Sequence, residues 1–187
     1  GQRGALLPRQ WTVSGSIEWP GQKRNFDSAK LTITHFGGKR LFENWNFLRA
    51  LHWVGADQKP VDLKFVGLTA RTPGLLGKIT PAVRKFWFRL GSESEFFSGT
   101  AWGLGIKSVS SPTEWNIQLT KSNLAIHANF KSELRALSGM VREDTNGSTL
   151  YEYATGLGTG ELSIYKDGKL EGNYVASPTV SFEHGTR

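Results

Sequence analysis

The chain has 187 residues, enough for one domain with a substantial hydrophobic core, and 23 Lys and Arg against 16 Asp and Glu give it a net charge of +7. The absence of cysteine excludes disulfides, thiolate metal sites and cysteine nucleophiles, and no apolar run approaches the roughly 20 residues of a membrane-spanning helix. Hydrophobic residues make up 38% and aromatic residues 12% of the chain, a globular composition whose many large rings favour strands and packed surfaces.

The N-terminal part is predicted to hold an arm and two strands. Gly1–Gln10 has no periodic pattern, so we expect an extended N-terminal arm that precedes a single domain over residues 11–187. Apolar and polar residues alternate over Trp11–Trp19 and again over Lys30–Phe36, the period-two pattern of half-buried strands. The polar segment Gly21–Ser28 between them is predicted to be a loop.

The stretch Asn44–Ala70 has the clearest patterning of the chain. The apolar residues of its first part, Asn44–Val54, are spaced loosely enough to fit either a helical turn or a bent strand. Farther on, Val61, Leu63 and Phe65 alternate with polar residues and therefore share one face. This second part is predicted to be a half-buried strand.

The remainder of the chain is predicted to consist of short strands and turns. Strands are expected over Leu75–Val83, Lys85–Leu90, Gly99–Val109, Thr113–Thr120, Leu124–Phe130, Leu150–Ala154, Glu161–Tyr165 and Leu170–Tyr174. Ser92–Ser98 is expected to be a loop and Asp144–Ser148 a turn, whereas Lys131–Val141 fits a short helix or a strand. Asp167-Gly168 has the chemistry of a hairpin turn. About nine or ten short strands at this spacing predict an all-β sandwich or barrel.

Two motifs suggest ligand binding or modification at first sight. Gly156-x-Gly158-x-Gly160 has the glycine spacing of a phosphate loop, but it lacks the Lys-Ser/Thr ending and a following amphipathic helix. A turn between strands is therefore predicted there. Asn146-Gly147-Ser148 is a glycosylation sequon, which we interpret as turn chemistry.

Candidate catalytic residues form no recognisable constellation. The four histidines, which have no metal-ligand spacing, are His35, His52, His127 and His184. The carboxylates that could face a groove, as in a glycosidase, are Glu93, Glu95, Glu114, Glu152 and Glu161. No pair among them singles itself out, and no G-x-S-x-G nucleophile motif occurs. The sequence therefore predicts neither an enzyme nor a metal or cofactor site.

Three segments resemble a known family. Phe47–Gly55, Val61–Gly67 and Gly77-Lys78-Ile79 are similar to segments of the jelly-roll coat proteins of picornavirus-like viruses, and most similar to the small coat protein of comoviruses and fabaviruses (Secoviridae), which are plant viruses. The chain departs from that pattern in a longer loop, Ala56–Pro60, and in Pro81. Such coat proteins are often released from a polyprotein between Gln and Gly, which a chain opening at Gly1 would suit.

This resemblance implies an eight-stranded jelly roll of two Greek-key sheets with short helical turns. The protein would then be a structural virion protein, a small capsid subunit that assembles in the host cytoplasm with copies of itself and a larger coat protein. The icosahedral shell would enclose RNA through non-specific electrostatic contacts. No catalysis, cofactor, metal or membrane would be involved.

Charge and aromatic content single out two sets of residues. Charge and loop position predict nucleic-acid contacts at Arg3, Arg9, Lys23, Arg24, Lys39 and Arg40. Six tryptophans are predicted to belong to the core or to subunit interfaces, namely Trp11, Trp45, Trp53, Trp87, Trp102 and Trp115.

Two other functions fit the same composition. A carbohydrate-binding or carbohydrate-cleaving β-sandwich would line one groove with Trp, flanked by paired carboxylates if it cleaves. A basic RNA-binding barrel that does not assemble would be a monomer whose affinity falls steeply with salt.

Overall fold

A computed structural model describes residues 3–37, 43–71, 82–99, 105–143 and 147–186. These residues form fourteen strands and one short 3-10 helix. The strands are β1 (Arg3–Trp19), β2 (Gln22–Gly37), β3 (Asn44–Ala50), β4 (Trp53–Val54), β5 (Pro60–Val61), β6 (Leu63–Arg71), β7 (Val83–Leu90), β8 (Glu93–Gly99), β9 (Ile106–Ser110), β10 (Glu114–Lys121), β11 (Leu124–Lys131), β12 (Ser138–Glu143), β13 (Thr149–Lys166) and β14 (Lys169–Thr186), and the helix is η1 (Leu134–Ala136). The predicted all-β class with short helical turns is confirmed.

The chain divides into two compact units, Gly1–Arg40 and Leu41–Arg187. The first is a long antiparallel ribbon of β1 and β2, closed by a turn at Pro20-Gly21 in which Gly21 has a φ of 77°. The predicted boundary after Gln10 therefore falls inside a strand, because β1 begins at Arg3 and its residues pair with β2 along the ribbon.

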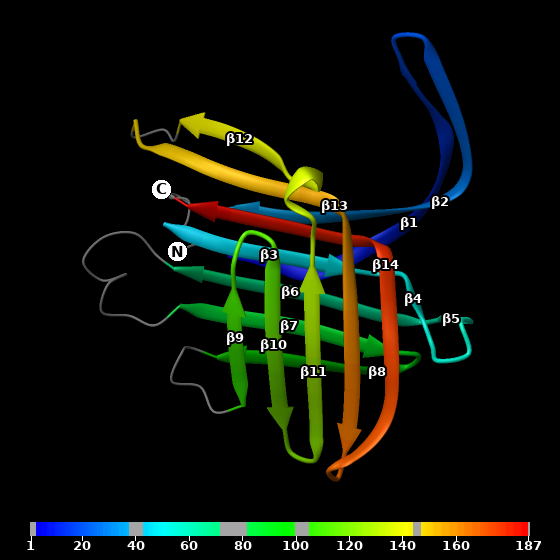
Figure 1. Cartoon of the computed structure of the whole chain (residues 1–187), viewed down its shortest axis with the longest axis vertical. Coiled ribbons are helices and arrows are strands. Elements are labelled where there is room, and N and C mark those ends of the chain that lie inside the picture. Colours follow the sequence, from blue (N-terminus) through cyan, green and yellow to red (C-terminus); the bar gives the residue numbers. More distant parts are fainter. Residues whose placement is uncertain (1–2, 38–42, 72–81, 100–104, 144–146, 187) are drawn as a thin grey trace. The chain divides into compact units, whose positions relative to one another are not determined.

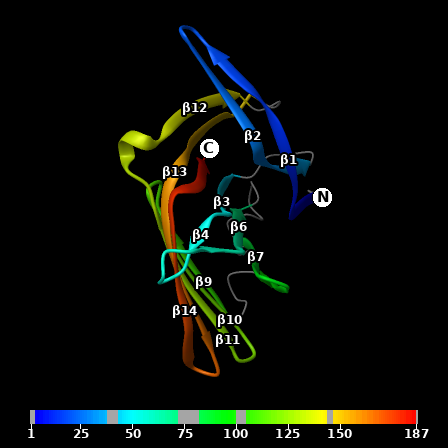
Figure 2. The same ribbon diagram turned by 90° about the vertical axis from the view of Figure 1, so that its right-hand side faces the viewer.

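The second unit is a curled antiparallel sheet with the strand order β8-β7-β6-β3-β14-β13-β11-β10-β9. β13 and β14 are long strands that bend, and each contributes to both layers of the resulting sandwich (Figure 1). One layer contains β9, β10 and β11 with one half of each long strand, and the other contains β3, β6, β7 and β8 with the other halves. Figure 2 shows the layers side by side. These curled sheets form a β-sandwich, and the jelly-roll expectation is consistent with them.

Aromatic side chains fill the space between the layers. Phe65 and Phe130 are completely buried, and their ring centroids lie 5.5 Å apart. The ring centroids of Phe130 and Trp53 lie 6.1 Å apart, and those of Phe86 and Trp115 lie 5.9 Å apart. The alternation predicted for β6 and β10 arises from this core, because alternate side chains of a strand point to the same face.

The bend of β13 coincides with its glycines. The pairing of β13 with β14 shifts register between Thr155 and Gly158 and again between Gly158 and Gly160. A Cβ at Gly158 would lie 3.0 Å from the Val180 carbonyl oxygen and 3.1 Å from the Lys131 carbonyl oxygen. The prediction of a turn at this motif is therefore wrong: the glycines let a continuous strand turn the corner between two layers.

Two predicted loops are also strands. Gly21–Ser28 belongs mostly to β2, where Gln22 pairs with Trp19 and Asn25 with Ser16. Ser92–Ser98 belongs mostly to β8, an edge strand that pairs with β7. Polar residues are tolerated in both because a ribbon and a sheet edge leave side chains in water.

Several open or partial predictions are resolved. Asn44–Val54 forms the bent-strand alternative, as β3 and β4, and Lys131–Val141 contains both alternatives, η1 followed by β12. The Asp167-Gly168 hairpin is confirmed, with φ values of 52° and 75°. Most of Leu75–Val83 and of Asp144–Ser148, and the first half of Gly99–Val109, lie outside the described residues.

Candidate functional site

The predicted nucleic-acid contacts all fall within the ribbon unit, Gly1–Arg40. Arg3 and Arg9 lie in β1 and Lys23 and Arg24 in β2, whereas Lys39 and Arg40 lie outside the described residues. The Lys23 ammonium lies 3.8 Å from the Glu18 carboxylate. Because Lys23 and Arg24 are consecutive in a strand, their side chains point to opposite faces. These two residues therefore do not form one basic surface.

The predicted tryptophans separate into three groups. Trp53 and Trp115 belong to the core, and their indole N–H groups donate to the Ala50 carbonyl at 3.1 Å and to Ser108 Oγ at 2.6 Å. Trp11 is exposed, and Trp102 lies outside the described residues.

Trp45 and Trp87 are half-buried and form the third group. The Trp45 indole N–H donates to Glu183 Oε1. Its ring also occupies the space that a Cβ at Gly185 would need, 2.1 Å from the ring.

One face of the ribbon is apolar and exposed. Trp11, Ile17 and Trp19 alternate along β1, so they share this face, and 43%, 59% and 38% of their surfaces are accessible. A two-stranded ribbon of this kind buries too little surface to be more than marginally stable by itself. Large exposed rings on such an element make this face a candidate interaction surface.

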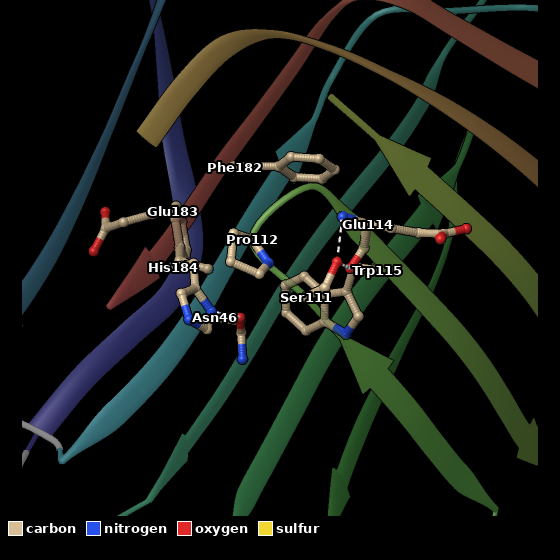
Figure 3. Close-up of a pocket in the computed structure, with 9 residues that line it drawn as sticks. Asn46, Ser111, Pro112, Glu114, Trp115, Phe182, Glu183 and His184 are labelled. Carbon is tan, nitrogen blue, oxygen red and sulfur yellow. Dashed lines mark hydrogen bonds between the residues drawn. The ribbon is translucent and has the colours of Figure 1, made fainter. Parts of the chain in front are cut away.

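A small pocket opens where the second unit brings three segments together: β3, the β9–β10 connection and the end of β14 (Figure 3). Its lining residues are Asn46, Phe47, Ser111, Pro112, Glu114, Trp115, Phe182, Glu183 and His184. The enclosed space suffices for about one water molecule. It is therefore far smaller than the roughly 300–1,000 Å³ clefts that bind whole small molecules.

His184 is held in the pocket by a chain of hydrogen bonds. Register places His184 opposite Asn46 in β3, and Asn46 opposite Thr69 in β6. His184 Nδ1 lies 2.7 Å from Asn46 Oδ1, and Asn46 Nδ2 donates to Thr69 Oγ1 at 3.1 Å. Because Asn46 directs its oxygen at the ring, Nδ1 carries the proton and Nε2 carries the lone pair of the neutral ring.

Burial also lowers the pKa of His184, so its neutral form is favoured at neutral pH. Among the described residues, the buried side-chain polar atom that lacks a hydrogen-bond partner is Arg89 Nε, and neither nitrogen of His184 is such an atom. The sequence interpretation of His184 as one of four unconnected histidines missed this arrangement. Asn46 lies 138 positions away, and no local signal connects the two residues.

The two carboxylates at the pocket point away from it (Figure 3). Glu183 accepts from Trp45, and Glu114 accepts from Asn129 Nδ2 at 2.8 Å on the outer side of β10. This hydrogen bond from the Asn129 side chain lowers the pKa of Glu114, and a hydrogen bond with Asn116 contributes a smaller lowering. The side chains drawn around the interior of the pocket are consequently uncharged.

The outer face of the β9–β10–β11–β13–β14 layer is a second polar surface. Cross-strand register aligns Lys107, Gln118, His127, Ser163 and Asn173 in one row across the five strands. Ser163 donates to Asn173 at 2.7 Å. We call this surface the polar sheet face, and it consists of that row and the neighbouring Asn116, Asn129, Glu161 and Tyr165.

The predicted carboxylates are dispersed. Glu95 forms an ion pair with Lys121 at 2.7 Å, Glu93 lies in edge strand β8, and Glu152 is buried. Among the described residues, no group of three or more His, Asp or Glu side chains could hold a metal ion. No helix among them is long and apolar enough to cross a membrane.

Comparisons with known proteins give little further information. No protein-family model and no curated protein matches the chain. Among solved structures, the crystal structure of a Nitrosomonas europaea protein provisionally named AttH is similar, with a TM-score of 0.46 and 8% identity. The likeness covers 76% of this chain, which spans half of that protein's length. A similarity at this level carries no functional argument.

Proposed function

We propose that this protein is a structural subunit that acts by assembly, as the small capsid subunit of an RNA-containing icosahedral shell. The observation that carries the proposal is the exposed apolar face of the ribbon, formed by Trp11, Ile17 and Trp19. Burying such side chains between subunits contributes about 25 cal/mol for each Å² of apolar surface removed from water. A long ribbon with this apolar face could pack against the surface of a neighbouring subunit.

The filled core supports an assembly role over a carrier role. The aromatic cluster around Phe65 and Phe130 occupies the space between the layers. A protein that carries a small molecule inside a β-sandwich would need a cavity in that space for its ligand. The pocket at His184 has room for a single small group. The outer surfaces of this sandwich therefore offer more area for recognition than its interior.

The net charge of +7 supports RNA as the enclosed partner. Contacts between dispersed basic side chains and phosphates need no base recognition, and their strength falls steeply with salt. A larger coat protein and further copies of this chain would complete the shell. This part of the proposal predicts salt-sensitive RNA uptake.

A substitution on the ribbon tests the proposal. We expect the purified protein, mixed with RNA and its coat-protein partner, to sediment as particles far larger than the 20.7 kDa monomer. Ile17→Lys should prevent this by placing a charge on the apolar face, whereas Ser16→Lys, on the opposite face of the same strand, should not. Monomeric protein under all these conditions, or equal assembly of both variants, would contradict the proposal.

The polar sheet face favours carbohydrate binding as a second candidate function. Amide and hydroxyl side chains such as Gln118, Ser163 and Asn173 match sugar hydroxyl groups, and the rings of His127 and Tyr165, 5.0 Å apart, offer a stacking surface. A glycan array tests this candidate with the double variant Gln118→Ala/Asn173→Ala. Binding that is strong for the unaltered protein and lost in the variant would support it, and an array without signal would exclude it.

A further inference from the structure

We propose that β12 pairs edge to edge with β12 of a second copy of this chain, so that the sheets of two copies become continuous. The pairing is antiparallel about a two-fold axis that passes between the two Val141 residues. This contact belongs to the second unit and needs neither the ribbon face nor RNA. It therefore goes beyond the proposed function and is tested separately from it.

β12 has one edge that faces no other strand of the described chain. It pairs with β13 alone, from Ser138 opposite Ala154 to Glu143 opposite Thr149. Ser138–Val141 and Glu143 are exposed. The free edge of a strand presents N–H and C=O groups that can pair with a strand of another chain.

The other two edges of the same sheet carry charges that oppose such pairing. In edge strand β8, Glu95 stands opposite the buried Phe88, so its carboxylate is on the core side of the sheet. Edge strand β9 contains Lys107. Lysines and inward-pointing charges are devices that keep natural sheet edges from pairing. β12 has no charged residue over Ser138–Val141, and its charges come only at its last two positions.

Apolar side chains extend to this free edge. Val141 is 68% exposed and stands opposite Tyr151 of β13, which is 46% exposed. Tyr153 stands opposite Gly139, and its ring lies 3.9 Å from the position that a Cβ of Gly139 would take. An exposed apolar surface next to an unprotected strand edge indicates an interaction site.

A second copy of the chain fits this edge by its own symmetry. Opposite residues of an antiparallel pair point to the same face, so pairing Val141 with the partner's Val141 aligns both with Tyr151 and the partner's Tyr151 in one row. Aromatic and β-branched neighbours are favourable cross-strand pairs. In this register the charged residues of β12 stand opposite Gly139 and Met140 of the partner, so no like charges oppose each other. One surface then serves both copies, as in other two-fold dimers.

The size of the contact sets its strength. Residues 139–143 of each copy pair in this register. Such a contact is smaller than the roughly 800 Å² per partner of a stable interface. We therefore expect a weak dimer in dilute solution. In an assembly that already holds copies close together, the effective concentration reaches about the millimolar range, and the same contact forms readily.

Sedimentation velocity of the full chain without RNA measures this association. Between about 10 µM and 1 mM protein, the average mass should rise from 20.7 kDa toward twice that value. Val141→Lys places two ammonium groups opposite each other and should weaken the dimer by about tenfold or more. Val109→Lys is the matched control, because Val109 is 73% exposed in edge strand β9. Both variants are also compared in an Ile17→Lys background, which removes association through the ribbon face.

A cysteine crosslink tests the register. The chain has no cysteine, so Val141→Cys introduces a single thiol. Opposite Cα atoms of an antiparallel pair lie about 4.5–5.5 Å apart, a separation that a disulfide spans. Mild oxidation with diamide should therefore join two Val141→Cys chains much faster than two Val109→Cys chains.

Three outcomes would overturn the proposal. The first is a monomer throughout the concentration range. The second is a dimer that Val141→Lys leaves intact, or that Val109→Lys weakens equally. The third is equal crosslinking of the two cysteine variants. The proposed function fails on a different result, the lack of large particles with RNA and the coat-protein partner, so the two failures are distinguishable.

Discussion

The replacement of Gly160 by alanine tests how the second unit is built. An added Cβ would lie 2.6 Å from Cδ1 and 2.8 Å from Cε1 of Phe130, and 3.4 Å from Cγ2 of Val180. The Phe130 ring has little room to move, because it is fully buried and its centroid lies 5.5 Å from that of Phe65 and 6.1 Å from that of Trp53. Because Gly160 has no side chain, the Phe130 ring can pack directly against its backbone.

The expected cost follows from overpacking. Inserting a methyl group into a packed core typically destabilises a protein by about 1–3 kcal/mol. With a urea m-value of roughly 1–3 kcal/mol per molar, the unfolding midpoint should fall by about 1 M. Gly156→Ala is the matched control, because an added Cβ there meets no atom within 4 Å, and it should be neutral or stabilise by up to about 1 kcal/mol.

Urea unfolding of the wild type and both variants, followed by tryptophan fluorescence, measures these differences. A Gly160→Ala midpoint equal to that of Gly156→Ala would refute the reasoning, because Phe130 would then have room to move. Loss of stability in both variants would instead indicate that the glycines are needed for the backbone path of β13. The two results separate side-chain crowding from backbone geometry.

Three further predictions concern single side chains. Burial lowers the pKa of His184, so as the pH falls the unfolded chain binds a proton at this residue before the folded protein does. The contribution of His184 to stability should therefore be complete above about pH 6.5, the ordinary histidine pKa, and should be lost as the pH drops toward the lowered pKa of the folded state. Urea midpoints measured from about pH 7.5 to 5 should show this fall, and His184→Gln should reduce it. Asn129→Leu removes the amide that stabilises the ionised Glu114, so the pKa of Glu114 should rise, as ¹³C NMR of its carboxyl would show. Phe65→Ala should cost about 3–5 kcal/mol in calorimetric or urea unfolding, whereas Phe96→Ala at an exposed position should cost far less.

Local patterning was sufficient for many individual strands. The alternation of Val61, Leu63 and Phe65 predicted a half-buried strand, and Leu63 and Phe65 are completely buried. Asp167-Gly168 predicted a two-residue hairpin, and both residues have the positive φ that this turn requires. Such features depend on neighbours within a few residues, so the sequence alone contains the information.

Pairing partners were needed for the strands that the pattern missed. Ser92–Ser98 reads as polar, yet most of it is a strand because β7 offers a hydrogen-bonding edge beside it. The glycines from Gly156 to Gly160 read as a turn, yet they allow β13 to continue through a bend. In both cases the competing preference is local and weak, and tertiary hydrogen bonding outweighs it.

The sequence by itself therefore determined the all-β class, the absence of thiol chemistry and the buried faces of several strands, because these follow from composition and period-two spacing. Only the tertiary structure decided which residues meet. It placed Phe130 over Gly160, set Asn46 against His184 across 138 positions, and turned the carboxylates of Glu114 and Glu183 away from the pocket. Strand order and register set these contacts, and both are properties of the whole sheet rather than of any segment within it.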